Sequence, residues 1–165
     1  MRVITDNTPL RYLILLGYVE ILPALFGRIM IPQSVVHELQ HPRTPEVVRL
    51  WLAHAPAWLE VRHSTSREDT ALSILDAGER DAILLMQEFN ADLLLIDEED
   101  GYGVATQRGM RCMRTVGMLE QAGIRGLLDL HEAIARLRRT NFRIRPEVLD
   151  NVLARDAERK RQTQG

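Results

Sequence analysis

Residues 91–100, ADLLLIDEED, are the stretch that decides the fold, because an unbroken aliphatic run stops there at four consecutive acids. An apolar run without alternation is typical of a strand that is buried on both faces in the middle of a parallel sheet. Asp97 then lies at the carboxyl end of this strand, which is the edge where open α/β sheets bind ligands. The alternative interpretation is a solvated acidic turn.

A similar plan appears at the N-terminus, where residues 2–6, RVITD, form a β-branched run that also ends in an acid. Further short strands are predicted at residues 28–31, 58–62 and 111–114, with helical patterns between them. This alternation predicts an α/β fold in which helices flank a central parallel sheet.

The glycines after the acidic run and the C-terminal part of the chain show different patterns. Residues 101–103, Gly-Tyr-Gly, are predicted to form a flexible turn that leads into a short helix ended by Gly109. From Leu127 onward the pattern is purely helical. We therefore divide the chain into an α/β part, residues 1–128, and a basic helical C-terminal extension of the same domain, residues 129–165.

The extension is rich in arginine. Residues 136–161 hold nine basic residues against four acidic ones. This pattern indicates either a solvated helix face or a contact for RNA or for an acidic segment of a partner protein.

The composition limits the class of protein. With 165 residues, 45% of them hydrophobic and 27% charged, the chain has the composition of one globular domain. Its net charge of -2 gives no basic field that would indicate a duplex-binding protein. The single cysteine, Cys112, excludes an internal disulfide and favours a reducing compartment. No apolar run approaches the roughly 18 residues of a membrane span, so we expect a cytoplasmic protein with no membrane partner.

Acidic residues lie at the ends of several predicted elements. Carboxyl ends of parallel strands share one edge and lie about 4.8 Å apart, so Asp6 and Asp97 can reach one cation. Helix starts face the same edge, which adds Glu79 and Asp81, although the helix dipole alone also favours acids there. Clustered carboxylates suit a hard ion such as Mg²⁺ or Mn²⁺, which can activate water for phosphodiester hydrolysis.

Five ordered blocks of the sequence resemble the motifs of the PIN-domain nucleases, in particular a prokaryotic branch that resembles VapC-type toxins. The blocks are VITDNTPL (3–10), IMIPQSVVHEL (29–39), AGERDAILL (77–85), LLLIDEE (93–99) and TVGMLEQAGIRGLL (115–128). The resemblance implies a Rossmann-like PIN fold and a ribonuclease that uses Mg²⁺ or Mn²⁺ to hydrolyse single-stranded RNA. It also implies a homodimer and the role of toxin in a type II toxin–antitoxin pair, with an antitoxin protein as partner.

The match can be read residue by residue. Asp6, Glu38 and Asp97 stand where the family has its first, its helix-borne and its last acid. The third acid is ambiguous, because Glu79 fits a Gly-Glu motif and Asp81 fits an Asp-Ala motif, and we favour Glu79. The predicted catalytic residues and metal ligands are Asp6, Glu38, Glu79 and Asp97, with Asp81 and Glu98 as further candidate ligands and Thr8 in a supporting role.

Two departures from the family pattern concern substrate contact. An arginine is common about five residues after the last acid, where this chain has Tyr102, and Arg114 stands where a glycine is common. A lost arginine removes a phosphate contact, so a second hypothesis is an inactive PIN-like module that binds or regulates. A receiver-type phosphotransfer protein is disfavoured, because the only lysine, Lys160, lies in the tail.

Overall fold

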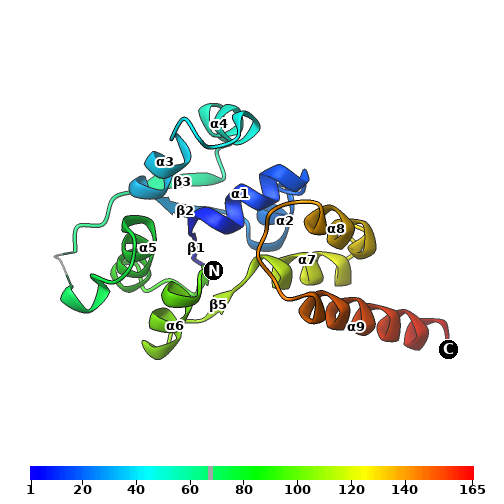
Figure 1. Cartoon of the computed structure of the whole chain (residues 1–165). Coiled ribbons are helices and arrows are strands. Elements are labelled where there is room, and N and C mark those ends of the chain that lie inside the picture. The colour runs from blue at the N-terminus through cyan, green and yellow to red at the C-terminus, as the bar shows by residue number, and fades with distance from the viewer. Residues whose placement is uncertain (67–68) are drawn as a thin grey trace. The chain divides into compact units, whose positions relative to one another are not determined.

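The computed structural model of this chain describes residues 1–66 and 69–165 (Figure 1). The chain divides into two compact units, Met1–Thr115 and Val116–Gly165. All the strands belong to the first unit, whereas the second unit is helical. That residues 129–165 belong to the same domain as the sheet stays a prediction.

The first unit is built on a central sheet. Among the described residues, five parallel strands form this sheet in the order β3-β2-β1-β4-β5. The strands are β1 (Val3–Thr5), β2 (Ile29–Pro32), β3 (Leu59–Arg62), β4 (Leu93–Leu95) and β5 (Cys112–Met113). All residues of β1 and β4 are buried, and Thr5 lies opposite Leu95. The α/β prediction and the interpretation of ADLLLIDEED as a buried strand are therefore confirmed.

Helices follow the strands along the chain. Those of the first unit are α1 (Asn7–Leu16), α2 (Ile21–Phe26), α3 (Gln33–Leu39), α4 (Glu46–Ala53), the 3-10 helix η1 (Thr70–Leu72), α5 (Ala77–Glu88) and α6 (Glu99–Gln107). Helix α5 packs against β1, β2 and β4, and its Ile83 and Leu85 join Ile4 and Leu94 in the core. Helix α3 packs against β2, β3 and α5. Ser34 Oγ at the start of α3 donates a hydrogen bond to the carbonyl of Ala77, the first residue of α5, at 3.4 Å, so the starts of the two helices lie close together.

The structure corrects one predicted element. Residues 101–103 were expected to form a turn, but α6 begins at Glu99 and both glycines lie within it. A Cβ atom at Gly101 would lie 2.6 Å from Ile96 Cδ1 and 3.4 Å from Glu79 Cδ. This glycine therefore serves close packing of α6 against Ile96 and Glu79, and the turn prediction was wrong because close packing and turns favour the same residue type.

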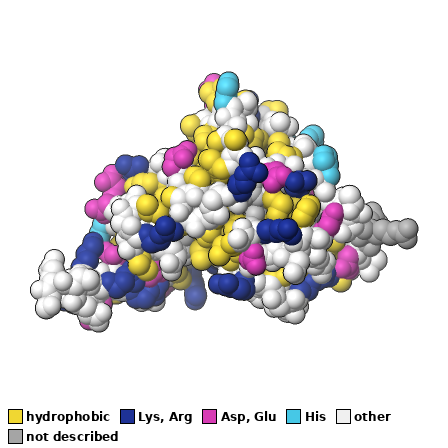
Figure 2. Space-filling model, turned by 180° about the vertical axis from the view of Figure 1, so that it is seen from behind, with side chains coloured by type: hydrophobic (Ala, Val, Ile, Leu, Met, Phe, Trp, Pro, Cys, Tyr) yellow, Lys and Arg dark blue, Asp and Glu magenta, His cyan; other side chains and the backbone are white. Residues whose placement is uncertain are grey.

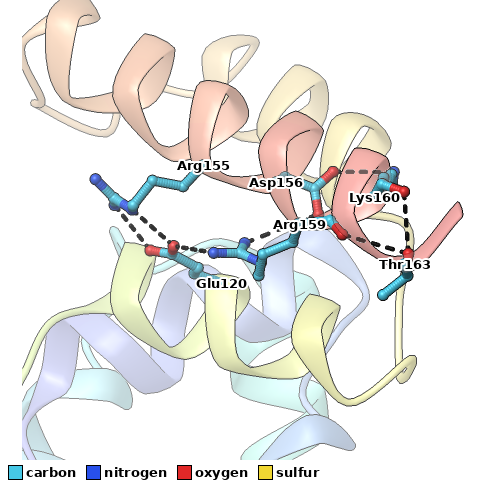
Figure 3. A network of polar contacts seen from close by, with 6 residues as sticks. All are labelled: Glu120, Arg155, Asp156, Arg159, Lys160 and Thr163. Carbon is cyan, nitrogen blue, oxygen red and sulfur yellow. Dashed lines mark hydrogen bonds and ion pairs between the residues drawn. The ribbon is translucent and has the colours of Figure 1, made fainter. Parts of the chain in front are cut away.

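Helix α7 (Thr115–Ile124) begins at the last residue of the first unit, and its other residues belong to the second unit. The second unit also contains α8 (Leu130–Arg138) and α9 (Pro146–Gln164). Glu120 on α7 accepts hydrogen bonds from Arg155 Nε and Nη2, each at 2.9 Å, and from Arg159 Nη1 at 3.2 Å (Figure 3). The buried Asp156 pairs with Lys160 at 2.9 Å. The bonds of Glu120 join α7 to α9, whereas the pair of Asp156 and Lys160 lies within α9.

The ion pairs also bear on the basic tail. Six of the nine basic residues in residues 136–161 pair with acids of the second unit, namely Arg136, Arg138, Arg155, Arg159, Lys160 and Arg161. Much of the positive charge of the tail is thus balanced within the unit itself. No helix formed by the described residues has the length and apolar character needed to cross a membrane.

Candidate functional site

The carboxyl edge of the sheet places Asp6 at the start of a helix. Asp6 directly follows β1 and is the N-cap residue of α1, and its backbone N–H donates to the carbonyl of Leu95 in the neighbouring strand at 2.9 Å. The Asp6 residue is only 2% exposed. Sheet pairing on both sides of β1 therefore fixes this carboxylate at the centre of the edge.

One oxygen of the Asp6 side chain has no hydrogen-bond partner, whereas the carboxylate does accept a hydrogen bond from the backbone N–H of Asn7. Its Oδ1 atom is buried and accepts no hydrogen bond from any residue that the structure describes. Burial raises the pKa of Asp6 well above its ordinary value, and the charges of Asp76, Glu79 and Glu38 raise it further. A buried carboxylate with one unpartnered oxygen is costly when charged, so this group either keeps a proton or takes up a cation.

Glu38, on α3, is held at the start of α5. Its Oε1 accepts a hydrogen bond from the backbone N–H of Gly78 at 3.0 Å, and its Oε2 accepts one from Asn7 Nδ2 at 3.2 Å. A Cβ atom at Gly78 would lie 2.8 Å from both carboxylate oxygens, so only glycine leaves room for Glu38 here. Burial raises the pKa of Glu38, and the charge of Asp76 raises it further, while the hydrogen bond from Asn7 lowers it.

Glu79 lies in the first turn of α5 and is 6% exposed. Burial, together with the charge of Asp76, raises the pKa of Glu79 to about 7. Asp76 is the N-cap residue of α5 and accepts a hydrogen bond from the backbone N–H of Glu79 at 2.8 Å. Asp76 was not among the predicted site residues, although an Asp three residues before a Glu is a capping signal that could have identified it.

The two candidates for the third acid face different neighbours. The charge of Glu79 raises the pKa of Asp6, whereas the charge of Asp81 raises the pKa of Glu38. Asp81 is half-buried and lines a cavity together with Gln33, Ser34 and Arg62, among others. Of the two residues, Glu79 is the one whose charge raises the pKa of Asp6.

Asp97 follows β4 and is clamped by Thr115. Its Oδ1 accepts a hydrogen bond from the backbone N–H of Thr115 at 2.9 Å, and its Oδ2 accepts one from Thr115 Oγ1 at 2.5 Å. Burial raises the pKa of Asp97, while the bonds from Thr115 and the charge of Arg114 lower it. Thr115 is a further residue of this region that was not among the predicted site residues.

The remaining acids of the run after β4 reach the solvent. Glu98, Glu99 and Asp100 are all exposed. Thr8 Oγ1 donates a hydrogen bond to Glu98 Oε1 at 3.1 Å, and the charge of Glu98 contributes to the raised pKa of Glu79. Thr8 and Glu98 therefore lie at the outer side of the acid cluster, which we define as Asp6, Glu38, Asp76, Glu79, Asp97 and Glu98.

The acid cluster can be tested for its fit to a divalent ion. Among the described residues, no three Asp, Glu, His or Cys side chains stand close enough together to hold one ion. The oxygens of Glu38 and Asp97 are instead engaged by Gly78, Asn7 and Thr115. The donor chemistry does fit a hard cation, because the cluster offers only oxygen ligands and includes the unpartnered Oδ1 of Asp6.

The chain is similar to known proteins in sequence and in fold. A family model described as DUF3368: PIN domain matches residues 2–158. A solved structure of a PilT N-terminus domain protein, SSO1118, from the hyperthermophilic archaeon Sulfolobus solfataricus P2 is similar with a TM-score of 0.50 and 16% sequence identity. The match covers 88% of this chain and 100% of that one, and at this identity it concerns the fold alone. A search of curated proteins gives no match.

Proposed function

This chain belongs to the PIN domain family, whose members are generally nucleases that use divalent metals, and we propose that it is an Mg²⁺- or Mn²⁺-dependent endoribonuclease acting on single-stranded RNA. The observation that carries the proposal is the buried Oδ1 of Asp6, which has no partner among the described residues, in a carboxylate whose pKa the charges of Glu38 and Glu79 raise. An inactive binding module has no need to maintain so costly an arrangement.

The proposed ligands are Asp6, Glu38, Glu79 and Asp97, with Asp81 and Glu98 near them. A divalent ion bound there supplies activation of water and neutralises charge that develops on the phosphoryl oxygens.

The chain's own residues have separate tasks in this proposal. Gly78 and Asn7 orient Glu38, Thr115 orients Asp97, and Thr8 orients Glu98. Glu79, whose pKa is raised to about 7, would release its proton on binding the ion, because a carboxylate ligand must be deprotonated.

The proposal is tested with the full chain, a labelled single-stranded RNA and Mn²⁺, beside matched samples of duplex RNA and single-stranded DNA. We expect cleavage of the single-stranded RNA, which chelation of the metal abolishes. Asp6→Asn and Asp97→Asn should lower the rate by at least about 100-fold, in the range of a lost general-acid, general-base or metal-holding group. Asp100→Asn is the matched control, because it makes the same change at an exposed acid of the same run.

Two outcomes would contradict the proposal. Cleavage that is equal in the wild type, Asp6→Asn and Asp97→Asn would place the chemistry elsewhere. A wild type that neither cleaves RNA nor binds Mn²⁺ would instead favour the inactive binding module.

We further propose that the protein is a homodimer and the toxin of a type II pair. Val47 and Leu50 of α4 and Val61 of β3 are exposed apolar residues that support a protein-binding surface. Figure 2 shows hydrophobic side chains reaching the surface in the region of α4. Light scattering should give a dimer that Leu50→Glu dissociates, and growth arrest on expression should be relieved by co-expression of a neighbouring antitoxin. A monomer at all concentrations would contradict the homodimer, and the absence of growth arrest would contradict the toxin role.

A further inference from the structure

Arg114 brings a positive charge to the acid cluster from the end of β5. Its guanidinium lies over the ring of Tyr102, with Cζ 4.0 Å from the ring centroid. Its Nη1 donates hydrogen bonds to the carbonyl oxygen of Asp97 at 3.1 Å and to Glu99 Oε1 at 3.0 Å. The charge of Arg114 thus lies directly beside Asp97.

Tyr102 gives this guanidinium a fixed platform. The ring belongs to α6 and packs, partly buried, against the hydrophobic core that contains Ile96 and Ala105. A cation held over an aromatic face is stabilised by the ring and loses less conformational freedom when it binds a further group. Arg114 is therefore oriented by its neighbours before any ligand arrives.

The ion pair of Arg114 with Glu99 is open to competition. The Arg114 side chain is 38% exposed, and that of Glu99 is 86% exposed. Exposed ion pairs contribute little to stability, so an anionic ligand can replace Glu99 at small cost. A phosphate group suits this position, because its oxygens match the fork of the guanidinium.

A positive charge at this position reduces the electrostatic repulsion between the acid cluster and RNA phosphates. The acid cluster carries several carboxylates at one edge of the sheet, and these repel the phosphates of an approaching nucleic acid. We propose that Arg114, oriented by Tyr102, binds a backbone phosphate of the RNA next to Asp97. This inference rests on the proposed function, and it makes Arg114 a substrate-binding residue and Tyr102 a positioning residue.

The test uses binding of a single-stranded RNA in the Asp6→Asn background, where cleavage does not interfere. Arg114→Ala should weaken binding by about tenfold, as expected for a lost hydrogen bond between charged groups. It should also lower the slope of log affinity against log salt by about 0.7, the value for one phosphate contact on a single strand. Arg111→Ala is the matched control, because this exposed arginine precedes the same short strand at its other end, and it should leave the slope unchanged.

A second variant separates substrate binding from a structural role. Since the ring of Tyr102 lies under the guanidinium, the double substitution Tyr102→Arg with Arg114→Ala returns a positive charge to nearly the same place. We expect this double variant to recover most of the affinity and the salt slope. In the cleavage assay, Arg114→Ala should raise KM with a smaller change in kcat, and a thermal melt should show each variant folded.

The outcomes distinguish this inference from the function on which it rests. If the wild type cleaves RNA but Arg114→Ala binds with the affinity and salt slope of Arg111→Ala, the role of Arg114 is overturned alone. The same holds if the double variant stays as weak as Arg114→Ala while remaining folded. If the wild type neither cleaves nor binds RNA, the proposed function and this inference are both overturned.

Discussion

The carboxylate of Glu38 accepts a hydrogen bond from the backbone N–H of Gly78 at 3.0 Å, although 40 residues separate the two in the chain. This contact ties α3 to the start of α5 and orients one acid of the cluster. It exists only because position 78 has no side chain, since a Cβ atom would lie 2.8 Å from both Glu38 oxygens.

Gly78→Ala should therefore displace Glu38 and lower the rate of RNA cleavage by at least about tenfold, as expected for a misplaced group at a reacting centre. The control is Gly103→Ala in α6, where an added Cβ meets nothing within 4 Å among the described residues. That substitution should leave cleavage unchanged and raise stability by about 0.5–1 kcal/mol, because alanine favours a helix over glycine. Equal cleavage by Gly78→Ala and the wild type would contradict the role given to Glu38.

Thr115→Val should move the acidic limb of the pH–rate profile. Both hydrogen bonds from Thr115 lower the pKa of Asp97, and valine keeps the backbone bond but removes the hydroxyl. The pKa of Asp97 should rise, so the acidic limb of the kcat/KM profile should move to higher pH. Thr115→Ser keeps the hydroxyl and should leave the profile in place. A Thr115→Val profile that coincides with the wild type would show that Asp97 does not titrate in the reaction.

The stability of the first unit should fall as the pH rises. The pKa of Glu79 is about 7 in the folded protein against an ordinary value of 4.5. Protonation of Glu79 thus favours the folded state fully below pH 4.5, and this contribution is lost as the pH rises through about 7. Asp6, whose pKa is also raised, acts in the same direction.

Glu79→Gln should remove part of this pH dependence. With the metal chelated, we expect the variant to have a free energy of unfolding at pH 8 that exceeds that of the wild type by on the order of 1–3 kcal/mol. Fluorescence reports this unit, because both tryptophans, Trp51 and Trp58, lie in it. Denaturant titrations at pH 5 and pH 8 measure the difference. A wild type that is as stable at pH 8 as at pH 5 would contradict the burial cost assigned to these acids.

In the second unit, Glu120→Ala should lower thermal stability. Glu120 accepts bonds from both Arg155 and Arg159, and these arginines hold its pKa below the ordinary value. Loss of a bidentate pair in a network should cost about 1–2 kcal/mol, measured by the helical circular dichroism signal on heating. Glu132→Ala, which removes only an exposed pair with Arg136, should cost at most about 0.5 kcal/mol. Equal losses of thermal stability in Glu120→Ala and Glu132→Ala would show that the Glu120 network contributes no more than an exposed ion pair.

The sheet and the positions of the acids that follow its strands could be predicted from the sequence. The unbroken apolar run that includes Leu93–Leu95 predicts a strand buried on both faces, and the structure has this buried strand between β1 and β5. Since strand ends share one edge, the positions of Asp6 and Asp97 follow from the fold itself. The match of the family model over residues 2–158 confirms the PIN-domain resemblance.

Other features depend on tertiary contacts that a local pattern does not contain. The pairing of Asp97 with Thr115 and of Arg114 with Tyr102 requires that the end of β5 meets the start of α6. Gly101 was predicted in a turn, because the space that it leaves for Ile96 is visible only in the packed structure. Tyr102 and Arg114 looked like two unrelated departures in the sequence, whereas in the structure they form one contact.

The central claim is that the acid cluster holds a divalent ion, and calorimetric titration of the full chain with Mn²⁺ at pH 7 tests it most directly. Because the raised pKa values of Asp6 and Glu79 favour protonated carboxyls, binding should release protons and its heat should depend on the ionisation enthalpy of the buffer. Asp6→Asn should bind at least about tenfold more weakly, while the exposed Asp100→Asn should bind like the wild type. Absence of Mn²⁺ binding by the wild type, or equal affinity in Asp6→Asn, would contradict the account.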